Sequence, residues 1–239
     1  MLYSSLDNDK IKYLKKLKEK KYRDLEGKFL IESEHLIKEA YKEGLLESVY
    51  VLEGNNIDID IDINYVTLKV LKSISSLASP KYLGVAKKLK EKEIGNKVVI
   101  LDNIQDPGNL GTIIRSSLAF NIDTIILSND SVDLYNDKVI RASEGMIFKL
   151  NIIRMDLENA LNNIKNTHYI YGTKVDGGNS LKRIEKREKF AIIMGNEGKG
   201  MSSSLEKYCN SFIYIDMNSK CESLNVGVAT SIILYELDK

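Results

Sequence analysis

Three short polar segments in the second half of the chain combine residue types that could do chemistry. They read DPGNLG at residues 106–111, GNEGKG at 195–200 and CESLNV at 221–226. Each comes shortly after an apolar run that is typical of a buried β-strand. Because ligands of open α/β sheets bind beyond the carboxyl ends of the strands, all three segments lie where a ligand is expected.

The first segment leads into the apolar helical stretch TIIRSSLAF at residues 112–120. Asp-Pro-Gly is a turn signal, and Asn109 is well placed to cap the helix. This interpretation leaves Arg115 unexplained, because it stands beside Ile113 and Ile114 and a buried cation without a partner is costly. The sequence allows two partners equally, an anion such as an RNA phosphate or a structural carboxylate.

The second segment is a glycine-rich turn with Glu197 at its centre. Glycines let the backbone approach a ligand closely and adopt positive φ. The order of residues gives neither the GxxxxGK[ST] spacing of a phosphate-binding P-loop nor the GxGxxG fingerprint of dinucleotide-binding folds. The turn therefore indicates a close approach to some other ligand, beside a carboxylate.

The third segment places Ser223 and Asn225 close to the start of the last helix, where capping is their simplest role. That helix is almost entirely apolar and is expected to be buried. His35 and His168 are the only histidines, and neither lies in the three segments. This argues against a Ser–His–Asp triad and against a histidine general base.

The pattern of apolar and polar residues along the sequence changes near residue 96. Before residue 90 the sequence is helix-rich and polar, whereas beyond residue 96 short apolar runs alternate with helical segments. This alternation predicts an α/β fold with a mostly parallel sheet covered on both faces. We expect a small α/β domain at residues 1–93 and a larger domain at 94–239. In the first, residues 57–63 alternate isoleucine with aspartate, which predicts an edge strand with a solvated acidic face.

Cations cluster near the amino terminus, although the formal net charge is only +1. Residues 10–24 contain eight Lys/Arg against two acids. Such a run is either a solvated helix face or a surface that contacts RNA phosphates. The candidates for phosphate contact are Lys15, Lys16, Lys20, Lys21 and Arg23.

Composition narrows the class of protein. The chain has 239 residues, of which 43% are hydrophobic, and its apolar runs fall short of the roughly 20 residues of a membrane-spanning helix. The first residues lack the apolar stretch of a secretory signal. Cys209 and Cys221 are too few to staple a domain of this size, and no His/Cys ligand set lies near them. We expect a cytoplasmic protein with reduced thiols, no metal and no membrane contact.

Taken together, NLGTIIR, MGNEGKG and ESLNV, in this order and near these spacings, resemble the three motifs of the SpoU/TrmH family in the SPOUT superfamily. The amino-terminal text DKIKYLKKLKEKKYRDLEGKFLIESEHLIKEA resembles the substrate-binding domain that precedes the catalytic domain in the ribosomal-RNA branch of that family. The resemblance therefore covers nearly the whole chain.

The resemblance implies a deep trefoil knot in the carboxyl-terminal domain, a homodimer, and S-adenosylmethionine as the cofactor. The positions that match the family's cofactor-binding set are Thr173, Gly195, Ile215, Met217 and Leu224. The positions that match its catalytic set are Asn109, Arg115, Glu197, Ser223 and Asn225. The sequence departs from the family pattern at four places, which are Ser33, Lys81-Tyr82, Asp216 and Cys221.

The expected activity is transfer of a methyl group from S-adenosylmethionine to a ribose 2′-hydroxyl, with 23S ribosomal RNA as the expected substrate and transfer RNA as the alternative. Two other interpretations are a catalytically silent RNA-binding protein that retains the knot and an enzyme that methylates a base. Arginine stays protonated because its pKa lies above about 12, so we expect Arg115 to hold the RNA phosphate and the 2′-oxygen.

Overall fold

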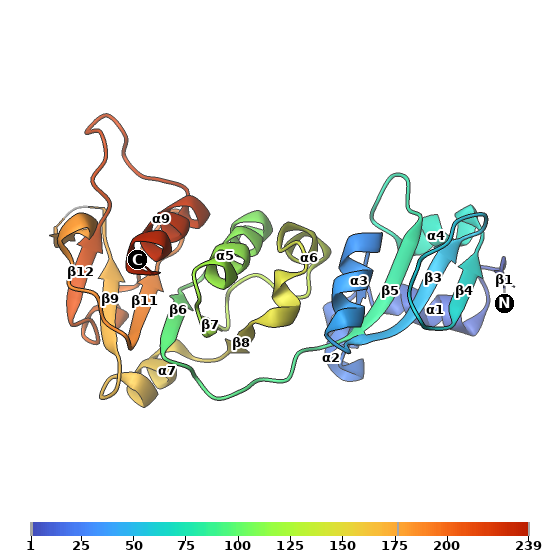
Figure 1. The fold of residues 1–239 in the computed structure, drawn as a ribbon, viewed down its shortest axis with the longest axis horizontal. Helices are drawn as coiled ribbons and strands as arrows, with labels where there is room; N and C mark the ends of the chain where they lie inside the picture. Colours follow the sequence, from blue (N-terminus) through green and yellow to red (C-terminus); the bar gives the residue numbers. More distant parts are fainter. Residues whose placement is uncertain (1, 176, 239) are drawn as a thin grey trace. The chain divides into compact units, whose positions relative to one another are not determined.

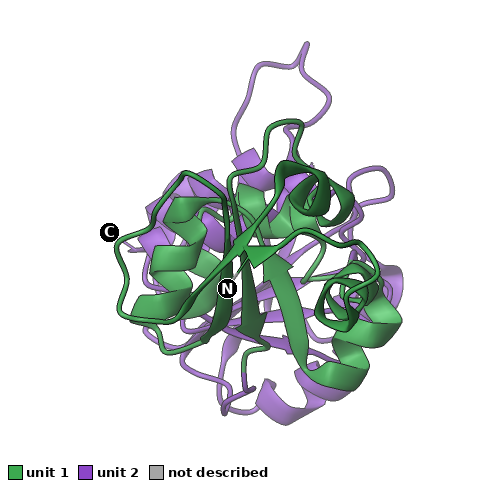
Figure 2. Ribbon diagram, turned by 90° about the vertical axis from the view of Figure 1, so that its right-hand side faces the viewer, with its two compact units in different colours: residues 1–89, 133–149 green, residues 90–132, 150–239 purple. Residues whose placement is uncertain are grey.

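The computed structural model describes residues 2–175 and 177–238. Contacts divide the chain into two compact units, which Figure 2 shows in different colours. Unit 1 takes the residues up to Leu89 together with Asp133–Lys149. Unit 2 takes Lys90–Val132 and the residues from Leu150 onward.

Unit 1 is a five-stranded mixed sheet with helices packed against it (Figure 1). The strand order is β1-β4-β3-β5-β2, with β1 and β3 parallel to β4 and with β5 antiparallel to both β3 and β2. The strands are β1 (Leu2–Tyr3), β2 (Lys28–Ile31), β3 (Leu46–Leu52), β4 (Ile63–Val66) and β5 (Tyr82–Lys87). The helices are α1 (Asp9–Lys16), α2 (Lys20–Glu26), α3 (Glu34–Lys42) and α4 (Leu68–Ile74).

The core of unit 1 follows from helical and strand spacing in the sequence. Ile11, Leu14 and Leu17 recur on one side of α1 and its end, and all three are buried against α4 and the sheet. The cations between them point outward. The predicted strand at residues 57–63 is wrong over most of its length, because β4 begins only at Ile63. Local backbone hydrogen bonds from Ile59 to Ile57 and from Ile61 to Ile59 hold this segment as a loop instead.

Asp133–Lys149 belongs to unit 1 although it lies between two strands of unit 2 in the sequence. It contains α6 (Asp137–Ala142) and the 3-10 helix η1 (Met146–Lys149). Two ion pairs attach it within unit 1, from Asp133 to Arg23 and from Lys149 to Glu39. Phe29 also packs against Tyr135 and Phe148, so the attachment is both apolar and ionic.

Unit 2 is a seven-stranded sheet in which all the paired strands run parallel. The strand order is β10-β12-β9-β11-β6-β7-β8. The strands are β6 (Lys97–Leu101), β7 (Thr124–Leu127), β8 (Asn151–Arg154), β9 (Tyr169–Thr173), β10 (Asn179–Ser180), β11 (Phe190–Met194) and β12 (Ser211–Tyr214). The central strands are buried on both faces, which explains their continuous apolar runs.

The helices of unit 2 cover both faces of its sheet. They are α5 (Pro107–Ala119), α7 (Leu157–Ile164), α8 (Ser203–Glu206) and α9 (Val226–Asp238), with the 3-10 helix η2 (Leu181–Arg183). Helices α7 and α8 pack their apolar residues onto one face, while α5 and α9 lie side by side on the other (Figure 1). Helix α9 is buried on one side only, because Val228, Ile232 and Tyr235 are exposed. The expected burial of the last helix is therefore confirmed for one side and wrong for the other.

Candidate cofactor and RNA site

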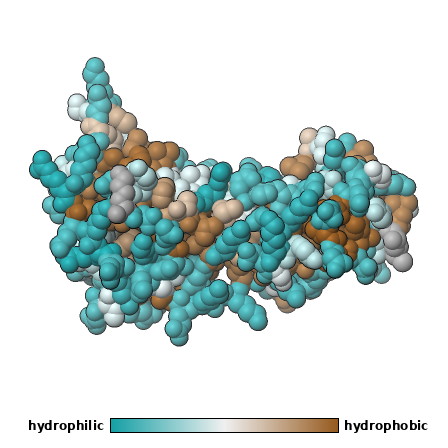
Figure 3. Space-filling view, in the orientation of Figure 1, coloured by the Kyte–Doolittle hydropathy of each residue, from teal (hydrophilic) through white to brown (hydrophobic). Residues whose placement is uncertain are grey.

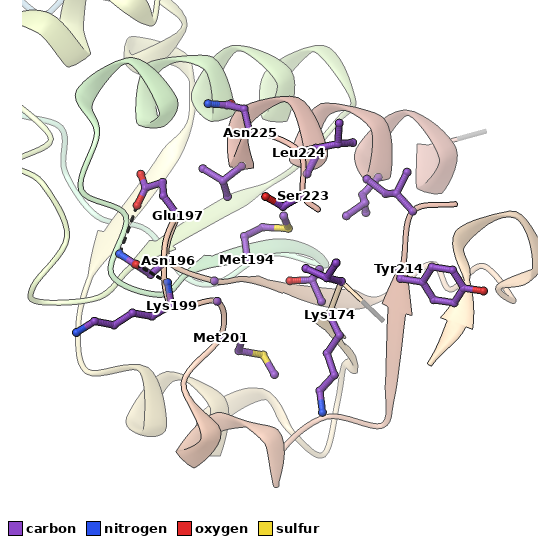
Figure 4. A pocket seen from close by; sticks show the side chains of 18 of the residues that line it. Lys174, Met194, Asn196, Glu197, Lys199, Met201, Tyr214, Ser223, Leu224 and Asn225 are labelled. Carbon is purple, nitrogen blue, oxygen red and sulfur yellow. Dashed lines mark hydrogen bonds between the residues drawn. The ribbon is translucent and has the colours of Figure 1, made fainter. Parts of the chain in front are cut away.

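A cavity of about 900 Å³ lies at the carboxyl ends of the strands of unit 2. Its walls come from the loops after β9, β11 and β12 and from the starts of α5 and α9, as Figure 4 shows. All three polar segments contribute to it. Asp106 and Asn109 come from the first, residues 195–200 from the second and Ser223–Val226 from the third.

The first segment forms the start of α5. Asp106, not Asn109, caps the helix, because its carboxylate accepts a hydrogen bond from the backbone N–H of Asn109 at 2.8 Å. Pro107 then occupies the first turn, where its missing N–H costs nothing. The prediction that Asn109 caps the helix is wrong, and its side chain is left available for the cavity.

Glu197 is held by donors from the first segment. Its carboxylate accepts hydrogen bonds from the backbone N–H groups of Gln105 and Asp106 at 3.2 and 3.1 Å, and from Asn109 Nδ2 at 3.1 Å. Burial by itself raises the pKa of this carboxyl, but the hydrogen bonds from Asn109 and the backbone outweigh it and lower the pKa. Glu197 therefore stays ionised and fixed in orientation.

A chain of hydrogen bonds links the three segments. Asn225 Nδ2 donates to Asn109 Oδ1 at 2.8 Å, and Asn109 in turn donates to Glu197. Asn225 also caps α9, because its Oδ1 accepts from the backbone N–H groups of Gly227 and Val228. The capping role expected for Asn225 is therefore confirmed, and the same side chain also connects α9 to the carboxylate.

The glycine-rich turn closes on itself at the edge of the cavity. Asn196 Oδ1 accepts hydrogen bonds from the backbone N–H groups of Gly198 and Lys199, both at 3.0 Å, and Asn196 pairs with Gly200. A Cβ atom on Gly195 would lie only 2.2 Å from backbone atoms of Gly200 and Met201. A glycine is thus required at residue 195 by the tight return of the chain.

All five residues expected to bind the cofactor line the cavity, namely Thr173, Gly195, Ile215, Met217 and Leu224. Thr173 is oriented by a hydrogen bond from its hydroxyl to the Ile193 carbonyl at 2.8 Å. Two residues that were not predicted, Lys174 and Glu206, also line the cavity and form an ion pair at 3.2 Å. Lys174 directly follows β9. Its position at the carboxyl end of a predicted strand is the one feature of the sequence that could have indicated a place in the site.

Four of the five residues expected to be catalytic line the cavity, and Arg115 does not. Arg115 is exposed on α5, so its burial, assumed from the apolar neighbours, is wrong. Helix α5 buries Ile113 and Ile114 and turns Arg115 away from them. Arg115 has no hydrogen-bond or ion-pair partner among residues 2–175 and 177–238.

The cations expected to contact RNA lie in unit 1. Lys15, Lys16, Lys20 and Lys21 lie on α1 and α2, and Lys16 and Lys21 flank the ring of Tyr22. Arg23 is different from these lysines. It is only 8% exposed, and its guanidinium pairs with Asp133 at 2.5 Å.

Comparison with known proteins gives the family. Residues 96–235 match the SpoU rRNA Methylase family, and residues 8–84 match the MRM3-like substrate binding domain. The chain is 32% identical in sequence to the 23S rRNA (guanosine(2553)-2′-O)-methyltransferase RlmP of Bacillus subtilis. The alignment covers 98% of this chain and 97% of that protein. The protein therefore belongs to the SpoU rRNA methylase family.

Solved structures agree with this assignment. A structure of an RNA 2′-O ribose methyltransferase superposes with a TM-score of 0.85 at 28% identity, covering 99% of this chain and 98% of the other. The AdoMet-bound rRNA methyltransferase of Sinorhizobium meliloti superposes with a TM-score of 0.85 at 25% identity, covering 99% and 97%.

These comparisons confirm several expectations from the sequence. The fold class, a small α/β domain before a trefoil-knotted SPOUT domain, is confirmed. The activity class, an RNA methyltransferase that uses S-adenosylmethionine, is confirmed as well. No helix within residues 2–175 and 177–238 is long and apolar enough to cross a membrane.

Proposed function

We propose that the protein transfers a methyl group from S-adenosylmethionine to a ribose 2′-hydroxyl in 23S ribosomal RNA, in the cytoplasm. The observation that carries the proposal is the hydrogen-bond chain from Asn225 through Asn109 to Glu197 at the edge of the large cavity. It fixes a carboxylate and two amides where a ribose and its phosphate would enter. The full-length similarity to a 23S ribosomal-RNA 2′-O-methyltransferase supports the choice of RNA.

The cavity suits S-adenosylmethionine by its chemistry. Met194, Ile213 and Leu224 give its walls apolar surface that could accept the adenine ring, beside polar groups. Loop backbone at residues 195 and 215–217 offers donors and acceptors to the edge of that ring and to the ribose. The carboxylates of Glu197 and Glu206 suit a cationic ligand. When bound, the cofactor supplies an electrophilic methyl group on a sulfonium.

The chain's own residues would then orient the RNA. In our proposal Glu197 and Asn225 hold the loop around the sulfonium, and Ser223 adds a hydroxyl at the same wall. Arg115 would grip an RNA phosphate and the 2′-oxygen, because its planar fork pairs well with phosphate. We assign to that phosphate the relay of the 2′-hydroxyl proton to solvent water. Positioning of the oxygen behind the methyl carbon supplies most of the expected rate enhancement.

Arg115 needs a second copy of the chain to take part, because it is exposed on α5 and does not line the cavity of its own chain. We infer a homodimer through α5 and α9. These helices pack against each other, and α9 exposes Val228, Ile232 and Tyr235 at helical spacing. Figure 3 shows apolar surface in the region of α9. A second copy that covers this apolar face could bring its Arg115 to the site.

The two parts of the chain are assigned separate tasks in this proposal. Residues 1–93 select and hold the RNA, and residues 94–239 bind the cofactor and carry out the transfer. The lysines on α1 and α2 support the first assignment, because they are far denser there than near the three polar segments. Asn109, Glu197 and Asn225 support the second assignment, because all three lie in unit 2.

Site-resolved mapping of 2′-O-methylation tests the proposal. Ribosomal and transfer RNA from cells with and without the protein are compared at every nucleotide. We expect one ribose position of 23S RNA to lose its methyl group without the protein and to regain it when purified protein and S-adenosylmethionine are added. A lost site in transfer RNA would replace the ribosomal substrate, and an unchanged map would refute the activity.

A further inference from the structure

Unit 1 contains a cavity of its own, of about 170 Å³, compared with about 900 Å³ for the cavity in unit 2. It lies where the connection between α1 and α2 meets the end of β2, the end of α4 and the start of α6. The residues that line it are Leu17, Lys18, Arg23, Leu30, Glu32, Ile74, Ser76, Tyr135, Asn136 and Asp137. All of them belong to unit 1.

One wall of this cavity is formed by the buried side chain of Arg23. Arg23 Nη1 donates to the carbonyls of Leu17 and Lys18, and Nη2 donates to Asp133. Nε is buried and has no hydrogen-bond partner among the described residues. Arg23 thus contributes to the wall a guanidinium whose Nη atoms are already hydrogen-bonded within the protein.

The other walls add acceptors and an apolar floor. Glu32, only 6% exposed, accepts hydrogen bonds from the hydroxyls of Ser75 and Ser76, and Asp137 is paired with Arg141. Leu17 and Ile74 are almost completely buried and provide apolar contact. The cavity therefore offers carboxylate acceptors and apolar surface in a small volume.

This chemistry favours an uncharged heterocycle over an anion. The charge of Arg23 is already neutralised by Asp133, and two further carboxylates, Glu32 and Asp137, line the cavity. A phosphate would be repelled by them. A nucleobase has apolar faces with donors and acceptors around its edge, and proteins bind extruded bases in small pockets of this kind.

The position of the cavity connects it to the lysines of α1 and α2. Leu17 and Lys18 line it, and they lie between Lys15–Lys16 and Lys20–Lys21 in the sequence. We propose that this cavity binds one unstacked base of the RNA substrate, whose neighbouring phosphates contact these lysines. The inference rests on the proposed function. It gives the first domain a site that recognises a base, in addition to lysines that contact phosphates.

A single tryptophan tests this proposal cleanly, because the chain contains none. Lys18→Trp places an indole at the cavity, and Lys12→Trp is the matched control, since Lys12 is also an exposed lysine of the same region but does not line the cavity. Fluorescence of both full-length variants is followed during titration with single-stranded RNA hexamers, with an abasic hexamer of the same backbone, and with free nucleoside monophosphates.

We expect base-containing hexamers to quench Lys18→Trp saturably and to bind roughly 5- to 150-fold more tightly than the abasic hexamer. Lys12→Trp should show no such difference. Adding Ser76→Leu, which narrows the cavity, should remove the preference, whereas Ser79→Leu in the same loop should not, because Ser79 does not line it.

Three results would overturn the proposal. They are equal affinity for the abasic hexamer, equal quenching of both tryptophan variants, and nucleoside monophosphates that bind as tightly as hexamers, which would indicate a small-molecule ligand. Methylation of ribosomal RNA by the parent protein is measured in parallel. If only the base preference is absent, the cavity proposal fails alone. If methylation is absent for every RNA, the proposed function fails, whatever the tryptophan reports.

Discussion

The cavity in unit 2 is lined mainly by contiguous loops, whereas the cavity in unit 1 is lined by residues from four separate parts of the chain. In unit 2 the parallel strands end at one edge, so each loop that follows a strand can supply several residues to one site. In unit 1 the walls come from helix ends and from the distant segment Asp133–Lys149. A site of the first kind leaves motifs in the sequence, and a site of the second kind leaves none.

The sharpest test of this division of tasks is Arg115→Ala in unit 2. Methyl transfer should fall at least about 100-fold, because a positioned cationic donor is removed. S-adenosylmethionine affinity should stay unchanged, because Arg115 is assigned to the RNA phosphate and the 2′-oxygen. Single-turnover methylation and calorimetric cofactor binding measure the two. Arg183→Ala, another exposed arginine of unit 2, is the control. A fully active Arg115→Lys variant would show that Arg115 acts only through its positive charge and not through its planar guanidinium.

The next largest effect is expected in unit 1, from replacing four lysines with glutamine, namely Lys15, Lys16, Lys20 and Lys21. If all four contact phosphates, RNA affinity should fall, and the slope of log affinity against log salt should shrink by roughly 0.9 for each phosphate that is no longer neutralised. Cofactor affinity should not change. The control variant removes the same number of positive charges from unit 2. It replaces four exposed lysines with glutamine, namely Lys165, Lys182, Lys186 and Lys189. If RNA affinity and its salt dependence are unaltered, the amino-terminal lysines do not contact RNA and serve only to keep the surface soluble.

A smaller effect on stability is expected from Glu39→Gln, which tests how Asp133–Lys149 is held in unit 1. Lys149 and Lys42 donate to the buried Glu39 carboxylate and lower its pKa from 4.5 to about 2. The carboxylate thus stabilises the fold above pH 4.5, and this stabilisation is lost as the pH falls towards 2. At pH 7 the variant should lose about 1–2 kcal/mol of unfolding free energy, allowing for the solvent around Lys42.

Denaturant titrations of parent and variant at several pH values measure this loss. The difference between parent and variant should disappear towards pH 2. Glu34→Gln on the same helix is the control, since the Glu34–Lys38 pair is exposed and should contribute less than about 0.5 kcal/mol. An equal loss for both variants would mean that burial of Glu39 adds nothing.

The alternation of apolar runs and helices was enough to predict the parallel sheet of unit 2, because strands buried on both faces must be apolar throughout. The loop at residues 57–62 misled the same reasoning. Alternation of isoleucine and aspartate fits a strand, but local hydrogen bonds within the loop satisfy the backbone there. A two-residue period shows which side chains could share a face and does not show that a neighbouring strand is present.

The site was predictable where each motif follows the carboxyl end of a strand or begins a helix there, as for Asn109, Glu197 and Asn225. It was not predictable where exposure depends on packing. The same apolar context suggested burial for Arg115 and for α9, yet Arg115 is exposed and α9 is exposed on one side. Sequence also cannot show that Ser33, in place of a glycine, adopts a φ of 125° and still caps α3 through its hydroxyl.

The smallest effect is expected from Cys221→Ser beside the unit 2 cavity, and it tests whether a thiol belongs to the site. Cys221 is exposed, and within the described part of the chain its thiol donates only to the Ser223 carbonyl, at 3.3 Å. A serine hydroxyl can replace this bond. Direct transfer of a methyl group to a ribose oxygen needs no covalent enzyme intermediate. The other cysteine is less suited still, because burial raises the pKa of the Cys209 thiol to about 11 and keeps it protonated. We therefore expect Cys221→Ser to keep the parent's rate in single-turnover methylation. A well-folded variant without activity would instead establish a covalent route through Cys221.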